Sequence, residues 1–121
     1  YSCPVPSLLS VLSERGLLAN TLVVIVGEFG RSPRIASNPH PGRDHWPQCY
    51  SAVLAGAGIR GGTVFGSSDK HGAAVRSRPV SPESFGATLF HALGIPPATR
   101  FGPDGFSQRV SDGQPISELF G

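Results

Sequence analysis

Residues 21–46 read TLVVIVGEFGRSPRIASNPHPGRDHW, and the expected architecture depends on this segment. It opens with an apolar, largely β-branched run at residues 22–26 that shows no polar alternation. Such a run predicts a strand buried on both faces, as in the middle of a parallel sheet. Gly27 interrupts the run, and charged side chains follow it. Because ligands of open α/β sheets bind outside the carboxyl ends of the strands, we expect a functional site just beyond residue 26.

A helix and a second strand are predicted on either side of this segment. Residues 6–14 place leucines on one helical face, and Gly16 follows as a stop signal. Residues 50–55 form a second apolar run, which leads into a glycine-rich segment. A helix followed by a buried strand is half of a crossover unit, so the pattern favours the α/β class.

A second helix is predicted after residue 81. Ser81 is a favourable N-cap, and Pro82 occupies the first helical position, where proline is well tolerated. Apolar residues then recur at helical spacing until Gly94. The other expected segments are a turn at 61–62 leading into a short strand at 63–65, a polar loop at 66–79, and an irregular tail from residue 98 with at most one turn around 116–120.

Composition limits the kind of protein that the chain can be. Its 121 residues suffice for one modest domain, and a hydrophobic share of 39% allows a packed core. The 16 glycines and 12 prolines indicate extensive loops and turns. A net charge of +2, without a basic helical stripe, gives no reason to expect a nucleic-acid partner. No apolar stretch approaches the roughly 20 residues that span a bilayer.

The start of the chain and its cysteines give two further expectations. The sequence begins Tyr-Ser-Cys, contains no methionine and shows no signal-like segment, so we expect a fragment or a processed piece of a longer protein. Cys3 and Cys49 could pair, although two simple thiols are the favoured interpretation.

Three side chains beyond the predicted strand are candidate metal ligands. Glu28 follows the apolar run directly, where a carboxylate is costly unless it is paired or binds a metal. Asp44 and His45 are adjacent, and carboxylate and imidazole are natural ligands for zinc or another divalent ion. The alternative for Glu28 is a salt bridge to a nearby arginine.

Arginines flank these residues. Arg31 and Arg43 could orient a sulfate or phosphate group through their guanidinium forks, or could simply balance the charge of the nearby carboxylates. Trp46 is expected to pack the loop down or to form a wall of the site. His71 lies in a polar segment and is interpreted as a solvated turn histidine, with a metal role as the alternative.

Three segments carry a resemblance to a known family. They are TLVVIVGEFGRSPRI, GRDHWPQCYSAVLAGAGIRGGTVFGSSD and PVSPESFGATLFHALGI. They resemble consecutive blocks of a bacterial family, the sulfatase-like domain of unknown function family 1501, which is similar to the alkaline phosphatase and sulfatase superfamily. The resemblance spans about residues 7–120 and corresponds to the C-terminal part of the family's domain.

The resemblance implies a fold and a site. It implies the C-terminal part of an alkaline-phosphatase-like α/β sandwich, with a small, mostly parallel sheet, flanking helices and long loops. Glu28 falls where the superfamily has a metal-binding aspartate, His45 resembles a later metal-binding histidine, and Asp44 would bind or assist. Phe29 departs from the pattern, because it stands where the superfamily has another histidine ligand. The superfamily's nucleophile lies upstream, in sequence that this chain does not contain.

Residues 1–121 are therefore expected to form a single domain fragment of a metal-dependent hydrolase of sulfate or phosphate esters, small-molecule or glycan. Glu28, His45 and Asp44 would hold zinc, calcium or manganese, and Arg31 and Arg43 would bind the anion. The isolated chain should be inactive. The alternative is a non-catalytic binding module on the same fold. Expected partners are the missing N-terminal part of the domain or a second copy, and the resemblance suggests an exported or periplasmic protein.

Overall fold

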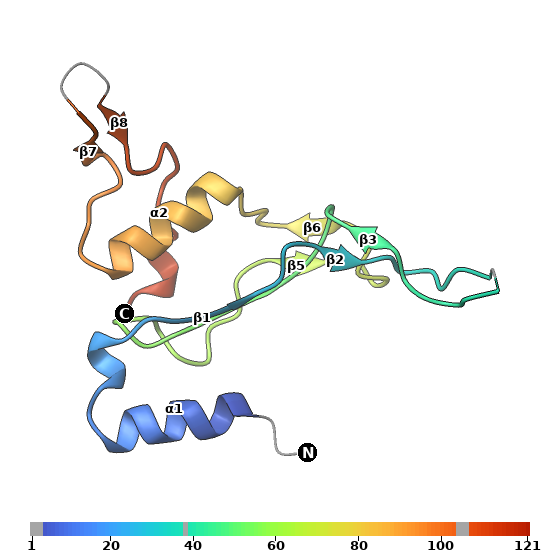
Figure 1. The fold of residues 1–121 in the computed structure, drawn as a ribbon, viewed down its shortest axis with the longest axis horizontal. Coiled ribbons are helices and arrows are strands. Elements are labelled where there is room, and N and C mark those ends of the chain that lie inside the picture. The colour runs from blue at the N-terminus through green and yellow to red at the C-terminus, as the bar shows by residue number, and fades with distance from the viewer. Residues whose placement is uncertain (1–3, 38, 104–106) are drawn as a thin grey trace. The chain divides into compact units, whose positions relative to one another are not determined.

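The computed structural model describes residues 4–37, 39–103 and 107–121 (Figure 1). The first helix, α1, spans Pro4–Glu14, so it begins slightly before the predicted start. Gly16 follows it with a φ of +68°, which ends the helix as the sequence predicts. None of the α1 side chains is buried, and Leu8 and Val11 are both exposed. A 3-10 turn at Leu18–Asn20 then leads into the first strand.

The second helix, α2, spans Pro82–Ala92 and confirms the predicted start. Ser81 is the N-cap, and its hydroxyl oxygen accepts a hydrogen bond from the Ser84 backbone N–H at 3.1 Å. Gly94 follows the helix with a φ of +76°. In the described residues, no helix is long and apolar enough to cross a membrane.

In the part of the chain that the structure describes, four two-stranded sheets are found in place of the predicted parallel sheet. Register is antiparallel for β2 with β3, for β5 with β6, and for β7 with β8, while β1 pairs with β4. The expectation of an alkaline-phosphatase-like sandwich with a mostly parallel sheet is therefore wrong for this chain. The strands are β1 (Val23–Val26), β2 (Gly30–Arg31), β3 (His45–Trp46), β4 (Ala52–Ala55), β5 (Ser67–Ser68), β6 (Val75–Ser77), β7 (Arg100–Phe101) and β8 (Gln108–Arg109).

The apolar run forms a strand, but that strand is not buried on both faces. In β1, Ile25 is 39% exposed and Val26 is 47% exposed, and in its partner β4, Val53 is 53% exposed. The physical reason is that β1 and β4 form a two-stranded sheet in the described residues, and such a sheet has no central strand of the kind that a doubly wound sheet buries on both faces. The apolar composition of residues 22–26 indicates that these side chains favour burial, but it does not reveal which other elements would cover them.

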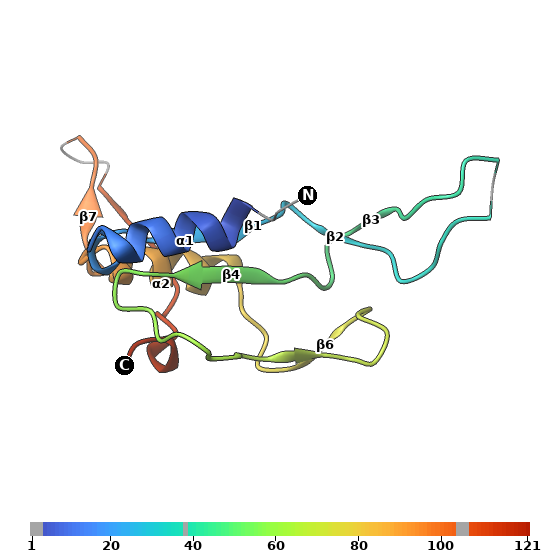
Figure 2. The same cartoon turned by 90° about the horizontal axis from the view of Figure 1, so that it is seen from below.

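The other differences between the predicted and the observed secondary structure involve short strands and hairpins. Residues 63–65, which the sequence predicts to be a strand, form none in the structure. The segment predicted as a polar loop instead contains β5 and β6, and the tail contains β7 and β8 before a 3-10 turn at Ser117–Leu119. Figure 2, turned from the view of Figure 1, shows β4 and β6 as extended segments. Strands of two or three residues leave too few alternating positions to be recognised in a sequence.

The chain divides into two compact units, which we describe separately. The helical unit comprises Tyr1–Val23, Leu54–Thr63 and Val80–Gly121, and the hairpin unit comprises Val24–Val53 and Val64–Pro79. The expectation that residues 1–121 form one domain fragment stays a prediction.

Thr88 of α2 lies in the interior of the helical unit and links α2 to the C-terminal segment by hydrogen bonds. Thr88 and its neighbour Ala87 are fully buried. The Thr88 hydroxyl donates to the Ser84 carbonyl oxygen at 2.7 Å and accepts from the Ile116 backbone N–H at 3.0 Å. Nearby, the Ser111 hydroxyl donates to the backbone carbonyl oxygen of Glu83 at 2.7 Å. These hydrogen bonds hold the C-terminal segment against α2.

Candidate functional site

The candidate residues Arg31 and His45 lie opposite each other on paired strands of the hairpin unit. In the β2–β3 pair, Gly30 faces Trp46 and Arg31 faces His45. Gly30 is required by the close approach of the backbones, because a Cβ atom there would lie 2.9 Å from the Trp46 carbonyl oxygen and would clash with that of Cys49. The two strands therefore bring both ends of the charged loop together.

Ser32 fixes the loop that follows β2. It is only 7% exposed. Its backbone N–H donates to the Asp44 carbonyl oxygen at 2.9 Å, and its hydroxyl oxygen accepts from the Asp44 N–H at 3.0 Å. The same hydroxyl donates to the Arg34 carbonyl oxygen at 2.8 Å. The backbone of Asp44 is thus held from both sides, while its side chain is exposed.

The two candidate anion-binding arginines brace this loop. Arg43 donates from one guanidinium nitrogen to the carbonyl oxygens of Ser32 at 2.8 Å and Pro33 at 3.0 Å. Arg31 donates to the Arg43 carbonyl oxygen at 3.2 Å. Neither arginine forms an ion pair with Glu28 or Asp44 within the described residues. Their observed role is to hold backbone, which neither sequence interpretation anticipated.

His45 packs against Phe29. The two rings are stacked, with centroids 3.8 Å apart and an angle of 23° between their planes. The guanidinium carbon of Arg31 lies 5.4 Å from the centre of the Phe29 ring. Phe29 therefore orients the imidazole from one face, a role that its position next to Glu28 did not reveal.

The proposed metal ligands do not make a metal site by themselves. Glu28, Asp44 and His45 are all exposed. Across residues 4–37, 39–103 and 107–121, no three His, Cys, Asp or Glu side chains form a group that could hold a metal ion. The donor set among these residues therefore does not fit a bound divalent ion without further ligands. Cys49 is half-buried and forms no disulfide with any residue that the structure describes. Cys3 lies outside the described residues, so the favoured interpretation of two simple thiols and the alternative of a pair both stay predictions.

A second group of residues in the hairpin unit lines a partly open pocket of about 480 Å³. The Trp46 indole N–H donates to the Ala73 carbonyl oxygen at 2.7 Å, so the ring both packs the loop down and forms a wall. The backbone N–H groups of His71 and Ala73 donate to an Asp69 carboxylate oxygen at 3.0 and 2.9 Å. The Ala73 N–H, followed by that of His71, holds the pKa of Asp69 below its ordinary value. The pocket is lined by Ser32, Pro33, Arg34, Trp46, His71 and Ala73.

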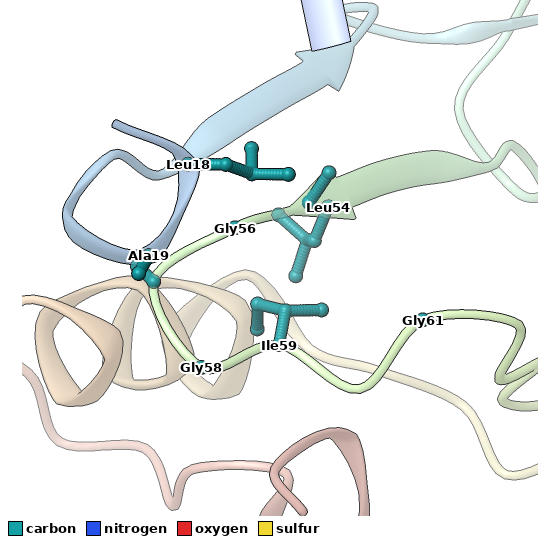
Figure 3. A pocket seen from close by; sticks show the side chains of 9 residues that line it. Leu18, Ala19, Leu54, Gly56, Gly58, Ile59 and Gly61 are labelled. Carbon is teal, nitrogen blue, oxygen red and sulfur yellow. The ribbon is translucent and has the colours of Figure 1, made fainter. Parts of the chain in front are cut away.

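An apolar pocket of about 410 Å³ lies in the helical unit (Figure 3). The side chains of Leu18, Leu54 and Ile59 line it, and none of its lining residues is charged or titratable. Gly56 has a φ of +77°, and a Cβ atom there would clash with the carbonyl oxygens of Thr21 and Leu18. This pocket offers apolar contact only and no group for acid–base chemistry.

The chain is thus a small protein of α-helices and short, paired β-strands, in which the β2–β3 hairpin exposes Asp44 and His45. The described residues contain no assembled metal centre. A family pattern matches residues 3–120, and the chain belongs to that family, the proteins of unknown function DUF1501. The expected membership of domain of unknown function family 1501 is thereby confirmed, and the relation to the alkaline phosphatase and sulfatase superfamily stays a prediction. No curated protein and no solved structure matches the chain.

Proposed function

We propose that this chain contributes part of a hydrolase of sulfate or phosphate esters related to the alkaline phosphatase and sulfatase superfamily. The observation that carries the proposal is the β2–β3 hairpin, in which the adjacent residues Asp44 and His45 are both exposed and the Asp44 backbone is held by hydrogen bonds. Groups that act on a substrate must be held in place by their surroundings. The Ser32 hydrogen bonds supply that support for Asp44, and the Phe29 ring supplies it for His45.

The residues of this hairpin suit distinct tasks at an ester. An imidazole such as that of His45 is a common proton donor or acceptor in catalysis, and the Asp44 carboxylate can orient a neighbouring donor. Arg43 uses one guanidinium nitrogen for the loop carbonyls, and a guanidinium carries five N–H donors. Its remaining donors can bind an anionic ester group next to the hairpin.

The chain alone is not a complete catalyst under this proposal. A divalent ion would need ligands from outside the described residues. The attacking group is likewise assigned to a part of the domain that this sequence does not include. We therefore expect the 121-residue chain to hydrolyse neither class of ester.

A non-catalytic binding module is the second candidate. The stacking of Phe29 on His45, with the Arg31 guanidinium beside the same ring, favours it. Phe29 is half-buried, and the exposed residues Arg31 and His45 flank it. Such a group of aromatic rings and a cation is suited to binding a ligand through ring faces and charge. In this case Asp44 and His45 would contribute to binding and not to turnover.

The test uses a longer family protein that contains this sequence. Its hydrolysis of 4-nitrophenyl sulfate and 4-nitrophenyl phosphate would be measured beside His45→Gln, Asp44→Asn and the control His40→Gln, which alters an exposed histidine of the same loop. Loss of a general acid or base lowers kcat by about 100-fold or more. We expect that loss for His45→Gln and near-normal activity for the control. Unchanged kcat in both His45→Gln and Asp44→Asn would favour the binding module.

A further inference from the structure

We propose that the pocket formed by Arg34, Trp46 and His71 binds a small ligand that joins an aromatic ring to an anionic group. This proposal concerns binding alone, and it holds whether or not the protein hydrolyses esters. The pocket volume of about 480 Å³ lies within the range of small-molecule sites. All of its lining residues belong to the hairpin unit.

The aromatic part of the ligand is inferred from the walls. The Trp46 indole is held in place because its N–H donates to the Ala73 carbonyl oxygen at 2.7 Å. With its polar N–H satisfied, the ring can contact a ligand through its apolar atoms, and a flat ring can stack on an indole. Pro33 and the Ala73 methyl group extend this apolar lining. A flat, apolar moiety would therefore displace water here at little cost.

The anionic part of the ligand is inferred from the guanidinium group of Arg34 at the same pocket. Arg34 makes no hydrogen bond or ion pair through its guanidinium with any residue that the structure describes, and His71 lines the pocket beside it. A free guanidinium fork binds sulfate, sulfonate, phosphate or carboxylate groups through two parallel hydrogen bonds. Arg34 thus differs from Arg31 and Arg43, whose guanidinium groups already hold the loop.

The net positive charge of the hairpin unit also favours an anionic ligand. It contains six arginine or lysine side chains against three carboxylates. One of those carboxylates, Asp69, is already engaged by two backbone N–H groups. The unit therefore attracts anions, and the pocket offers them a defined place to bind.

The chain supplies its own probe for a test, because Trp46 is its single tryptophan. Intrinsic fluorescence therefore reports on the wall of this pocket directly. The purified chain would be titrated with phenyl sulfate, and separately with the half-ligands phenol and inorganic sulfate. Benzoate would test whether a carboxylate replaces the sulfate group. We expect phenyl sulfate to change the Trp46 emission with saturation, and to bind at least about tenfold more tightly than either half-ligand.

Two variants of equal charge separate this pocket from general attraction of anions. Arg34→Gln removes the proposed anion-binding group, and Arg76→Gln removes an exposed cation of the same unit that does not line the pocket. We expect about tenfold weaker binding for Arg34→Gln and less than a twofold change for Arg76→Gln, because only the former loses a charge-assisted hydrogen bond. Circular dichroism of both variants would verify that they remain folded.

Three results would overturn the proposal. Absence of a saturable change with phenyl sulfate and with benzoate would show that the pocket does not take this class of ligand. Equal weakening by Arg34→Gln and Arg76→Gln would show attraction to the net charge only. Equal affinity for inorganic sulfate and phenyl sulfate would show that Trp46 contributes no binding surface. Loss of esterase activity in the longer protein affects none of these readings, so this proposal and the hydrolase proposal fail separately.

Discussion

Replacing Ser32 with alanine should loosen the candidate hairpin without unfolding the helical unit. The Ser32 hydroxyl makes two hydrogen bonds, one donated to the Arg34 carbonyl oxygen and one accepted from the Asp44 N–H. A buried neutral hydrogen bond contributes about 0.5–1.5 kcal/mol net, so losing two costs about 1–3 kcal/mol. That cost corresponds to an increase of about 5- to 150-fold in the local opening equilibrium.

Hydrogen exchange measured by NMR tests this expectation. The Asp44 amide should exchange about 5- to 150-fold faster in Ser32→Ala than in the wild type, because its acceptor is gone. The Leu93 amide, which donates to the Leu89 carbonyl oxygen at the end of α2, should be unaffected. Ser37→Ala is the matched control, since Ser37 is an exposed serine of the same loop. Unchanged exchange at Asp44 would refute the argument that the buried hydroxyl fixes the site.

Two further predictions concern a turn and a glycine. Asp69 has a lowered pKa, so its carboxylate stabilises the fold above its unfolded pKa, and this contribution is lost as the pH falls through the folded pKa. The Tm advantage of the wild type over Asp69→Asn should therefore be present at pH 7 and shrink below about pH 4, and an equal advantage at both pH values would contradict this cause. Gly56→Ala places a methyl group against two carbonyl oxygens at a positive φ. It should cost more than about 2 kcal/mol in urea unfolding, whereas Gly42→Ala, which has open space around it, should cost less than about 1 kcal/mol.

Local signals in the sequence predicted local structure well. The Ser81-Pro82 pair and Gly94 correctly bounded α2, because an N-cap, a proline at the first position and a terminal glycine each act through neighbouring residues. Gly16 marked the end of α1 for the same reason. These signals need no information about distant parts of the chain.

Signals that depend on distant partners were less informative. The run at residues 22–26 does form a strand, but its β-branched side chains could not reveal that its sheet has only two strands. Likewise, the charges of Arg31 and Arg43 suggested an anion or a carboxylate partner. Their guanidinium groups instead meet backbone carbonyl oxygens, which a sequence does not distinguish from any other acceptor.

In the candidate site, too, residue types could be recognised from the sequence, whereas contacts between distant residues could not. Asp44 and His45 were recognised by residue type, and whether they act on an ester stays a prediction. The stacking of Phe29 on His45 was missed, although the pairing of β2 with β3 is what brings the two rings together. The pocket beside Trp46 depends on a contact with Ala73, far along the chain, and no spacing rule encodes it.

The two-stranded β1–β4 sheet has a practical consequence for work with this chain. Each of its strands has hydrogen-bonding groups along an edge that no other strand of the described structure covers. Ile25, Val26 and Val53 are exposed on these strands. Exposed apolar edges of this kind recruit additional strands, whether from a covering segment or from a neighbouring molecule. Protein concentration therefore becomes an experimental variable, and titrations of this chain belong at low micromolar concentration with sizing before and after.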